Sequence, residues 1–135
     1  MRILICDDDP LIIEQLQKFI ESFFKSNHIK CPELVSFTSG ESLLADSEEK
    51  DLVFLDIEMP GMNGIYIGNE LKKANKNVII FVVTSYSEYL DDAMRFHVFR
   101  YLSKPLDRSR FLRNMKDALT YYNSITVKIP VETRQ

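Results

Sequence analysis

The chain has 135 residues, which matches one ordinary domain and is enough to bury a hydrophobic core without disulfide or metal cross-links. Hydrophobic residues make up 45% of the chain and charged residues 27%, which is typical of a globular protein and excludes an intrinsically disordered one. The formal net charge of −3 argues against nucleic-acid binding by the chain as a whole, because phosphate binding needs a basic surface.

Short apolar runs alternate along the chain with longer amphipathic segments. The runs are rich in β-branched and aromatic residues, as buried strands are, and the segments between them repeat apolar residues at three- and four-residue steps, as helices do. In chain order we predict strand 3–6, helix 10–26, strand 34–37, a helix begun by a capping box from Thr38 to Glu41, strand 52–55, helix 63–74 capped by Asn63, strand 78–83, helix 87–96, strand 98–102 and helix 107–123.

This alternation predicts an α/β fold, in which a doubly wound parallel sheet is covered by helices on both faces. Residues 124–135 do not fit the pattern. Ile125, Val127 and Ile129 alternate with polar residues like a new strand, and Pro130 follows. We therefore expect one domain over 1–123, and a linker or the start of a truncated output domain over 124–135.

The charges are divided unevenly between the two halves. Residues 1–60 hold 13 acidic and 5 basic residues (net −8), residues 61–135 hold 7 and 12 (net +5), and the two sum to −3. This split predicts an acidic site in one half and a cationic group in the other.

The two cysteines, Cys6 and Cys31, form neither a disulfide framework nor a metal-binding spacing. The apolar run near Met1 is too short for a signal peptide or a membrane span. We therefore expect a cytoplasmic protein without a membrane partner.

Polar residues follow four of the predicted strands. Asp7 and Asp8 follow the first strand, Asp56 the third, Thr84 the fourth and Lys104 the fifth. Because the carboxyl ends of parallel strands share one sheet edge, where such folds bind ligands, we expect these side chains to meet.

Three neighbouring carboxylates repel one another and resist ionising together unless a cation lies between them. Oxygen ligands without histidine or cysteine favour a hard ion, Mg²⁺ or Mn²⁺, over zinc. A lysine would pair with phosphate oxygens as a point charge, and one carboxylate would act as a nucleophile toward phosphorus.

Residues 1–123 resemble the receiver domain of bacterial two-component response regulators. The resemblance rests on four segments: Cys6-Asp7-Asp8-Asp9-Pro10, Leu55-Asp56-Ile57-Glu58-Met59-Pro60-Gly61-Met62-Asn63-Gly64, Val83-Thr84-Ser85 and Tyr101-Leu102-Ser103-Lys104-Pro105. It implies a flavodoxin-like (βα)5 sheet with strand order 2-1-3-4-5.

The resemblance implies that Asp56 accepts a phosphoryl group from a sensor histidine kinase. It implies that Asp7, Asp8, Asp56 and the backbone carbonyl of Glu58 hold Mg²⁺ or Mn²⁺, and that Lys104 pairs with the phosphate. The chain would then be a signalling phosphoacceptor and not an enzyme, limited to self-phosphorylation and slow autodephosphorylation.

By the same resemblance, Thr84 and Tyr101 form the switch pair that responds to the phosphoryl group. Tyr86 occupies a position that influences the lifetime of the acyl phosphate. The peptide between Lys104 and Pro105 would be cis.

The tail resembles the entry into a LytTR-type DNA-binding domain, a subfamily that also favours the Ile-Cys-Asp-Asp start and the Ser-Tyr-Ser-Glu-Tyr segment of residues 85–89. The regulator would then control transcription, and would bind DNA only through an output domain that this chain lacks.

Basic residues surround the last predicted strand and helix and alternate there with acids, a mixture that suits self-complementary pairing. A solvated face is the simpler interpretation of most of them. The sharper hypothesis is a homodimer formed on phosphorylation through Arg95, Arg100 and Arg113.

Two other functions compete with the receiver interpretation. Asp56 and Glu58 resemble the paired acids of a Mg²⁺-dependent aspartyl-phosphate phosphohydrolase, but the chain has no insertion to form a substrate cap. A degenerate receiver that acts as a constitutive binding module has usually lost an acid or the lysine, whereas here the set is complete.

Overall fold

The computed structural model describes residues 1–59, 63–85 and 97–126. Its centre is a parallel sheet in the order β2-β1-β3-β4-β5, which confirms the predicted fold class and strand order. The strands are β1 (Arg2–Cys6), β2 (Glu33–Phe37), β3 (Leu52–Leu55), β4 (Ile79–Thr84) and β5 (Arg100–Ser103).

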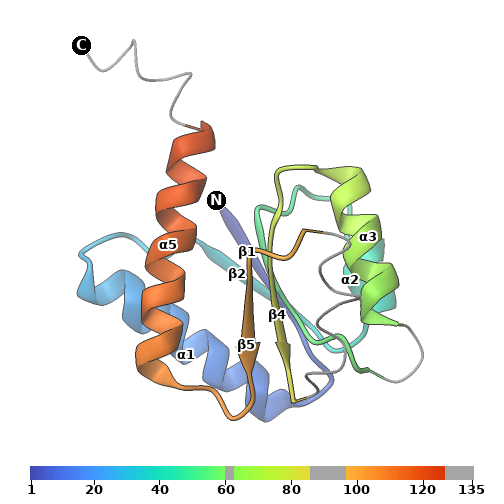
Figure 1. Cartoon of the computed structure of the whole chain (residues 1–135), viewed down its shortest axis with the longest axis horizontal. Helices are drawn as coiled ribbons and strands as arrows, with labels where there is room; N and C mark the ends of the chain where they lie inside the picture. Colours follow the sequence, from blue (N-terminus) through green and yellow to red (C-terminus); the bar gives the residue numbers. More distant parts are fainter. Residues whose placement is uncertain (60–62, 86–96, 127–135) are drawn as a thin grey trace.

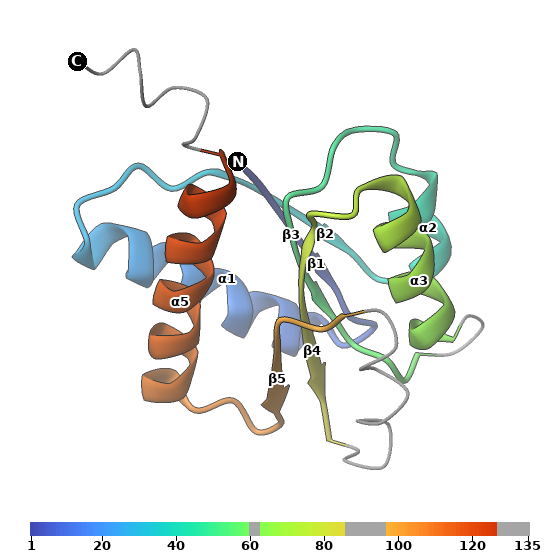
Figure 2. The ribbon, with the colours of Figure 1, turned by 45° about the horizontal axis from the view of Figure 1, so that its top comes forward.

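Helices cover both faces of the sheet (Figures 1 and 2). On one face lie α1 (Pro10–Ser26) and α5 (Arg108–Thr126), and on the other lie α2 (Gly40–Ala45) and α3 (Gly64–Ala74). The helix predicted over 87–96 lies outside the described residues. None of the described helices is long and apolar enough to cross a membrane.

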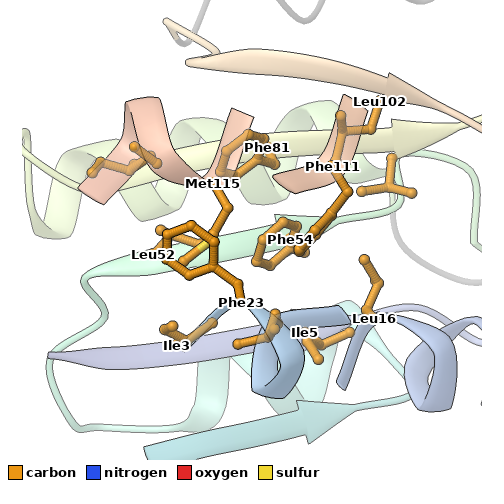
Figure 3. Close-up of a cluster of buried hydrophobic side chains, with 14 of the residues drawn as sticks. Ile3, Ile5, Leu16, Phe23, Leu52, Phe54, Phe81, Leu102, Phe111 and Met115 are labelled. Carbon is orange, nitrogen blue, oxygen red and sulfur yellow. The ribbon is translucent and has the colours of Figure 1, made fainter. Parts of the chain in front are cut away.

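Each face of the sheet has its own hydrophobic cluster, because successive side chains of a strand point to opposite faces. On the α1–α5 face, the rings of Phe54 and Phe81 stack with centroids 4.8 Å apart, and Phe111 of α5 lies 5.5 Å from Phe54 (Figure 3). The other cluster, here called the α2–α3 core, consists of Leu4, Cys6, Leu43, Val53, Leu55, Ile57, Met59, Ile67, Leu71, Val78, Ile80 and Val82.

Side chains that accept backbone hydrogen bonds set the starts of three helices. Asp9 accepts from the amide of Leu11 at the start of α1, and Asn63 accepts from the amide of Ile65 at the start of α3, as its predicted cap. The capping box predicted from Thr38 was wrong. Ser39 is the cap of α2, because its side chain accepts from the amide of Ser42.

Apolar residues just outside the strands caused the boundary errors at β4 and β5. Val78 and Val98 contact the α2–α3 core, and Phe99 packs against the opposite cluster. Burial therefore accounts for their apolar character, although the Phe99 amide also donates to the carbonyl of Ile80 on β4 over 2.8 Å. Strand β4 starts one residue later than predicted and includes Thr84, while β5 starts at Arg100.

Helix α5 extends to Thr126, past the end predicted at residue 123. The hydroxyl of Thr126 donates to the carbonyl of Tyr122, four residues earlier, as within a continuous helix. The strand-like reading was therefore wrong for Ile125 and Thr126, and residues 127–135 lie outside the described residues. The domain boundary itself remains a prediction.

A half-buried ion cluster lies at the amino end of the sheet, opposite the predicted site. The guanidinium of Arg2 donates to both carboxylate oxygens of Asp46, over 2.7 and 3.0 Å, and Lys50 lies 3.1 Å from the same carboxylate. The hydrogen bond from Arg2 is the main reason that the pKa of Asp46 falls to about 2. The cluster ties β1 to the segment between α2 and β3.

Replacing Asp46 with asparagine should lower the free energy of unfolding at pH 7 by about 1.5–3 kcal/mol, the usual range for a hydrogen bond to a charged group. Because the pKa of Asp46 is depressed in the folded chain, its stabilising effect is complete above its ordinary value of 3.8 and is lost as the pH falls toward 2. Urea unfolding between pH 7 and pH 3 should show a difference between the two proteins that shrinks below pH 4. A difference that stays constant over this range would contradict the assignment.

Candidate functional site

The carboxyl ends of four strands bring the predicted side chains to one edge of the sheet. Asp7 and Asp8 follow β1, Asp56 follows β3, Thr84 ends β4 and Lys104 follows β5. Backbone hydrogen bonds continue the pairing past the strand ends, from the Asp56 amide to the carbonyl of Cys6 (3.0 Å) and from the Lys104 amide to that of Thr84 (3.1 Å).

The three aspartates form one cluster. Asp7, Asp8 and Asp56 each offer a carboxylate oxygen, and these oxygens lie within 4.8 Å of one another. Asp7 and Asp56 are only 1% and 5% exposed, whereas Asp8 is exposed. The cluster therefore opens to solvent on the side of Asp8, which gives an incoming group a route to the buried carboxylates.

Lys104 supplies the cation that the charge distribution predicted. Its Nζ lies 3.3 Å from Oδ2 of Asp56 in a hydrogen bond, and 2.9 Å from Oδ2 of Asp7. The contact with Asp7 is short enough for an ion pair but lacks hydrogen-bond alignment, so this buried oxygen has no hydrogen-bond partner. One lysine thus pairs with the two buried carboxylates of the cluster.

Backbone amides fix the other oxygen of each buried carboxylate. The amide of Asp9 donates to Oδ1 of Asp7 over 2.9 Å, and the amide of Glu58 donates to Oδ1 of Asp56 over 3.0 Å. Sequence reasoning missed both contacts, because the donors belong to the backbone. Their only sequence signal is the two-residue spacing typical of a carboxylate that accepts from a nearby amide.

Burial shifts the acid–base behaviour of the cluster. It raises the pKa of Asp7 and of Asp56 above the usual value for aspartate, although the amides and Lys104 act in the opposite direction. Burial alone would lower the pKa of Lys104, but the adjoining carboxylates outweigh it, and the net pKa is raised. Burial, with help from the aspartates, raises the pKa of the Cys6 thiol to about 12, so the thiol stays protonated near neutral pH.

The donor set fits a hard divalent cation. It offers carboxylate oxygens without histidine or cysteine, one of its buried oxygens lacks a hydrogen bond, and three carboxylates outnumber the single lysine. A cation between them would offset both the burial and the mutual repulsion that raise the pKa values of Asp7 and Asp56. Asp7, Asp8 and Asp56 are therefore the described residues best placed to hold Mg²⁺.

The two predicted switch residues lie on the same face of the sheet. Tyr101 pairs with Val82, which is two residues before Thr84 on β4, so the three side chains point to the same side. Thr84 is buried, whereas Tyr101 is half-buried and packs against the α2–α3 core. The peptide between Lys104 and Pro105 is cis, which confirms that prediction.

Two of the residues predicted for a dimer surface, Arg100 and Arg113, lie on β5 and α5. Arg100 on β5 lies over the ring of Phe99, 4.5 Å from its centroid, and 3.5 Å from Asp117 of α5. Arg113 is exposed on α5. Arg95 and Tyr86 lie outside the described residues.

Comparison with protein families places most of the chain in one of them. The model of the response regulator receiver domain matches residues 3–116. An uncharacterised response regulatory protein of Vibrio cholerae is 33% identical over 109 residues, covering 79% of this chain and 40% of that protein. The sensory transduction protein LytT of Bacillus subtilis is 30% identical over 135 residues, covering 100% of this chain and 53% of LytT. The chain thus spans about half or less of these relatives.

Solved structures agree with the fold. The response regulator TrrA of Thermotoga maritima, determined in complex with Mg²⁺ and a beryllium fluoride, is 31% identical with a TM-score of 0.73, covering 87% of this chain and 97% of TrrA. The response regulatory domain of MrkE from Klebsiella pneumoniae has a TM-score of 0.81 at 23% identity, covering 92% and 99% of the two chains. The second similarity concerns the fold alone.

Proposed function

The chain belongs to the family of response regulator receiver domains, and from that membership we propose that Asp56 accepts a phosphoryl group from a sensor histidine kinase in a Mg²⁺-dependent reaction. The observation that carries the proposal is the cluster itself. Three carboxylates lie within 4.8 Å of one another, and Lys104 lies 3.3 Å from the proposed acceptor.

In the proposed reaction, a carboxylate oxygen of Asp56 forms a bond to phosphorus while the bond from phosphorus to the donor's histidine nitrogen breaks. The imidazole leaves with the electron pair and is protonated from solvent. The Glu58 amide holds the carboxylate in orientation, and the Lys104 ammonium pairs with phosphoryl oxygens as charge develops on them.

The proposed metal ligands are Asp7, Asp8, Asp56 and the backbone carbonyl of Glu58. When bound, Mg²⁺ or Mn²⁺ would neutralise the carboxylates and the phosphoryl oxygens that approach them. The structure of TrrA with Mg²⁺ and a beryllium fluoride supports this proposal by similarity.

We further propose that Thr84 and Tyr101 report the phosphorylated state. Thr84 ends β4 beside Lys104, and its hydroxyl would donate to the phosphoryl group. Tyr101 lies on the same face of the sheet and would move into the space that Thr84 leaves. Phosphorylation then biases a two-state domain through a local hydrogen bond.

The output that we propose is DNA binding through a LytTR-type domain joined to this receiver, with the receiver over 1–123 and the junction over 124–135. The similarity to LytT and to the transcriptional regulatory protein BtsR of Escherichia coli supports it. The proposed setting is the cytoplasm, where a kinase would reach Asp56.

The proposal is tested by intact-mass analysis after incubation with a small acyl phosphate and Mg²⁺. We expect the mass to increase by one phosphoryl group. No increase should occur when the metal is chelated before the donor is added. Absence of a gain under conditions that label a known receiver would overturn the proposal. Multiple turnover on phosphate esters would instead support a phosphohydrolase.

Mg²⁺ should stabilise the folded chain, because it binds the carboxylate cluster only when that cluster is assembled. At a concentration about 100 times its dissociation constant, the gain in unfolding free energy should be about 2.7 kcal/mol. Replacing Asp8 with asparagine should remove most of this gain. The control is Asp9→Asn, which keeps the cap of α1 and should respond to Mg²⁺ like the wild type. An equal response from Asp8→Asn would exclude Asp8 as a ligand.

We also propose that the phosphorylated receiver forms a homodimer through the surface around Arg100 and Arg113. Reversing one charge with Arg113→Glu should raise the dimer dissociation constant about tenfold. The new carboxylate would face acidic groups across the interface, and like charges placed opposite one another weaken association. Mass measurement by light scattering on the phosphorylated protein tests this, with Lys30→Glu as the matched charge reversal away from this surface. Unchanged dimerisation in Arg113→Glu would exclude Arg113.

A further inference from the structure

Helix α3 begins directly against the backbone that follows Asp56. A Cβ atom added at Gly64, the first residue of α3, would overlap the Cα of Ile57 and lie 2.9 Å from both the carbonyl carbon and the Cβ of that residue. Atoms in a folded protein are not compressed to such distances without displacement. Only glycine fits at position 64 unless Ile57 or the helix moves.

Ile57 has little freedom to yield. Its side chain is 4% exposed and belongs to the α2–α3 core, and its carbonyl accepts from the amide of Gly64 over 3.3 Å. Because the side chain is held by the core, a methyl group at position 64 would push on the backbone of Ile57. That backbone joins Asp56 to Glu58, so the displacement reaches both.

The Glu58 amide is the group that would transmit this displacement to the site. It donates to Oδ1 of Asp56 over 3.0 Å, while Oδ2 of the same carboxylate accepts from Lys104. These two bonds fix the rotation of the carboxylate about its Cβ–Cγ bond. A shifted Glu58 amide would release one of them.

We propose that Gly64 is a positioning residue for Asp56. Its missing side chain lets α3 hold the backbone of Ile57 and Glu58 where the amide of Glu58 orients the Asp56 carboxylate. That this orientation speeds phosphoryl transfer rests on the proposed function of Asp56. The hydrogen bond that orients the carboxylate does not depend on that function.

The direct test compares Gly64→Ala with Leu71→Ala at a temperature where each is folded, first without metal and then with Mg²⁺. Leu71 lies on the same helix in the same core but does not lie against Ile57 in this way, so its truncation destabilises α3 without the clash. The first readout is the amide resonance of Glu58 in a ¹H–¹⁵N spectrum. It should shift upfield on the proton axis in Gly64→Ala, as a weakened hydrogen bond requires, and stay in place in Leu71→Ala.

The second readout is the rate of phosphoryl labelling by a small acyl phosphate at saturating Mg²⁺. A misoriented carboxylate should slow it about 10- to 100-fold in Gly64→Ala, because misplacing a reacting group by about 1 Å can cost about 100-fold in rate. Leu71→Ala should stay within about twofold of the wild-type rate. Both variants destabilise the chain, but only Gly64→Ala displaces the backbone of Ile57.

If Gly64→Ala does not fold, variants of Asn63 test the proposal in its place. Its side chain accepts from the Ile65 amide over 2.6 Å and anchors the first turn of α3. Asn63→Ala should loosen that turn, shift the Glu58 resonance and slow labelling several-fold. Asn63→Ser retains a capping oxygen and should restore both.

The outcomes separate the two proposals. Suppose that the wild type is labelled, and that Gly64→Ala and Leu71→Ala have the same Glu58 resonance and the same labelling rate. That result would overturn the role of Gly64 and leave Asp56 as the acceptor. If the wild type is not labelled, the proposed function fails, and the Glu58 resonance alone decides whether Gly64 orients Asp56. An unshifted Glu58 resonance in Gly64→Ala overturns the positioning role of Gly64. If Gly64→Ala does not fold, an unshifted Glu58 resonance in Asn63→Ala overturns that role.

Discussion

Replacing Asp56 with asparagine should abolish the acid-labile phosphoryl label that an acyl phosphate and Mg²⁺ introduce into this chain. The amide cannot form the acyl phosphate, and Asp7 and Asp8 are proposed as metal ligands and not as acceptors. We expect a loss of at least about 100-fold in the labelling rate, measured by intact mass and by acid lability of the label.

The same substitution should leave the fold intact and somewhat more stable without metal. Asp56 is 5% exposed and shares one lysine with Asp7, so removing its charge relieves both burial and repulsion. The raised pKa of Asp56, caused mainly by burial, has the same meaning, because the charged form is disfavoured in the folded chain. The labelling loss can then be separated from unfolding by urea denaturation of the same sample.

Asp9→Asn is the matched control for this result. It removes a neighbouring acid, but asparagine still caps α1, and the backbone amide that donates to Asp7 is retained. It should label at the wild-type rate. A label that survives in Asp56→Asn, or that disappears equally in Asp9→Asn, would refute the assignment of Asp56.

The sheet and the set of residues at its carboxyl edge follow from the sequence because two physical rules act together. Buried parallel strands have to be apolar along their whole length, which makes runs such as 52–55 visible. A right-handed α/β topology then places the residue after each run on one edge, so Asp7, Asp56 and Lys104 converge whatever the details of the helices.

Element ends are less predictable, because burial and pairing are separate causes of apolar character. Phe99 packs against the hydrophobic cluster on the α1–α5 face of the sheet. Its apolar character therefore placed it inside the predicted strand, although β5 begins one residue later. Ile125 alternates with polar neighbours like a strand residue, yet the helix before it continues through Thr126. A local pattern cannot separate these cases, since the deciding contacts come from other elements.

The contacts that orient the site were not predictable from side-chain types. The donors to Asp7 and Asp56 are backbone amides, and the close approach of Gly64 to Ile57 depends on where α3 lies on the sheet. Likewise, Arg2 is separated from Asp46 by 44 positions, and nothing in the sequence between them marks the pair. Such contacts depend on tertiary placement.

Lys104→Met should cause the largest stability loss of any single change at the site, measured in metal-free buffer. The ammonium is the described cation that faces Asp7 and Asp56, whose side chains are 2% and 6% exposed. Removing one partner of a buried ion pair costs about 3–5 kcal/mol. Because the lysine side chain is 18% exposed, we expect a loss at the lower end of that range, about 3 kcal/mol.

Two further measurements identify the cause of that loss. Mg²⁺ should recover part of it, because a bound cation replaces the missing positive charge among the carboxylates. The double variant Lys104→Met with Asp56→Asn should be more stable than Lys104→Met alone, with a coupling of about 1–3 kcal/mol, because the unpaired charge is removed together with its partner. Lys116→Met, an exposed lysine of α5, should stay within about 0.5 kcal/mol of the wild type. Additive effects of the two site variants would show that Lys104 does not stabilise the fold through Asp56, and its role as the countercharge of that carboxylate would then be wrong.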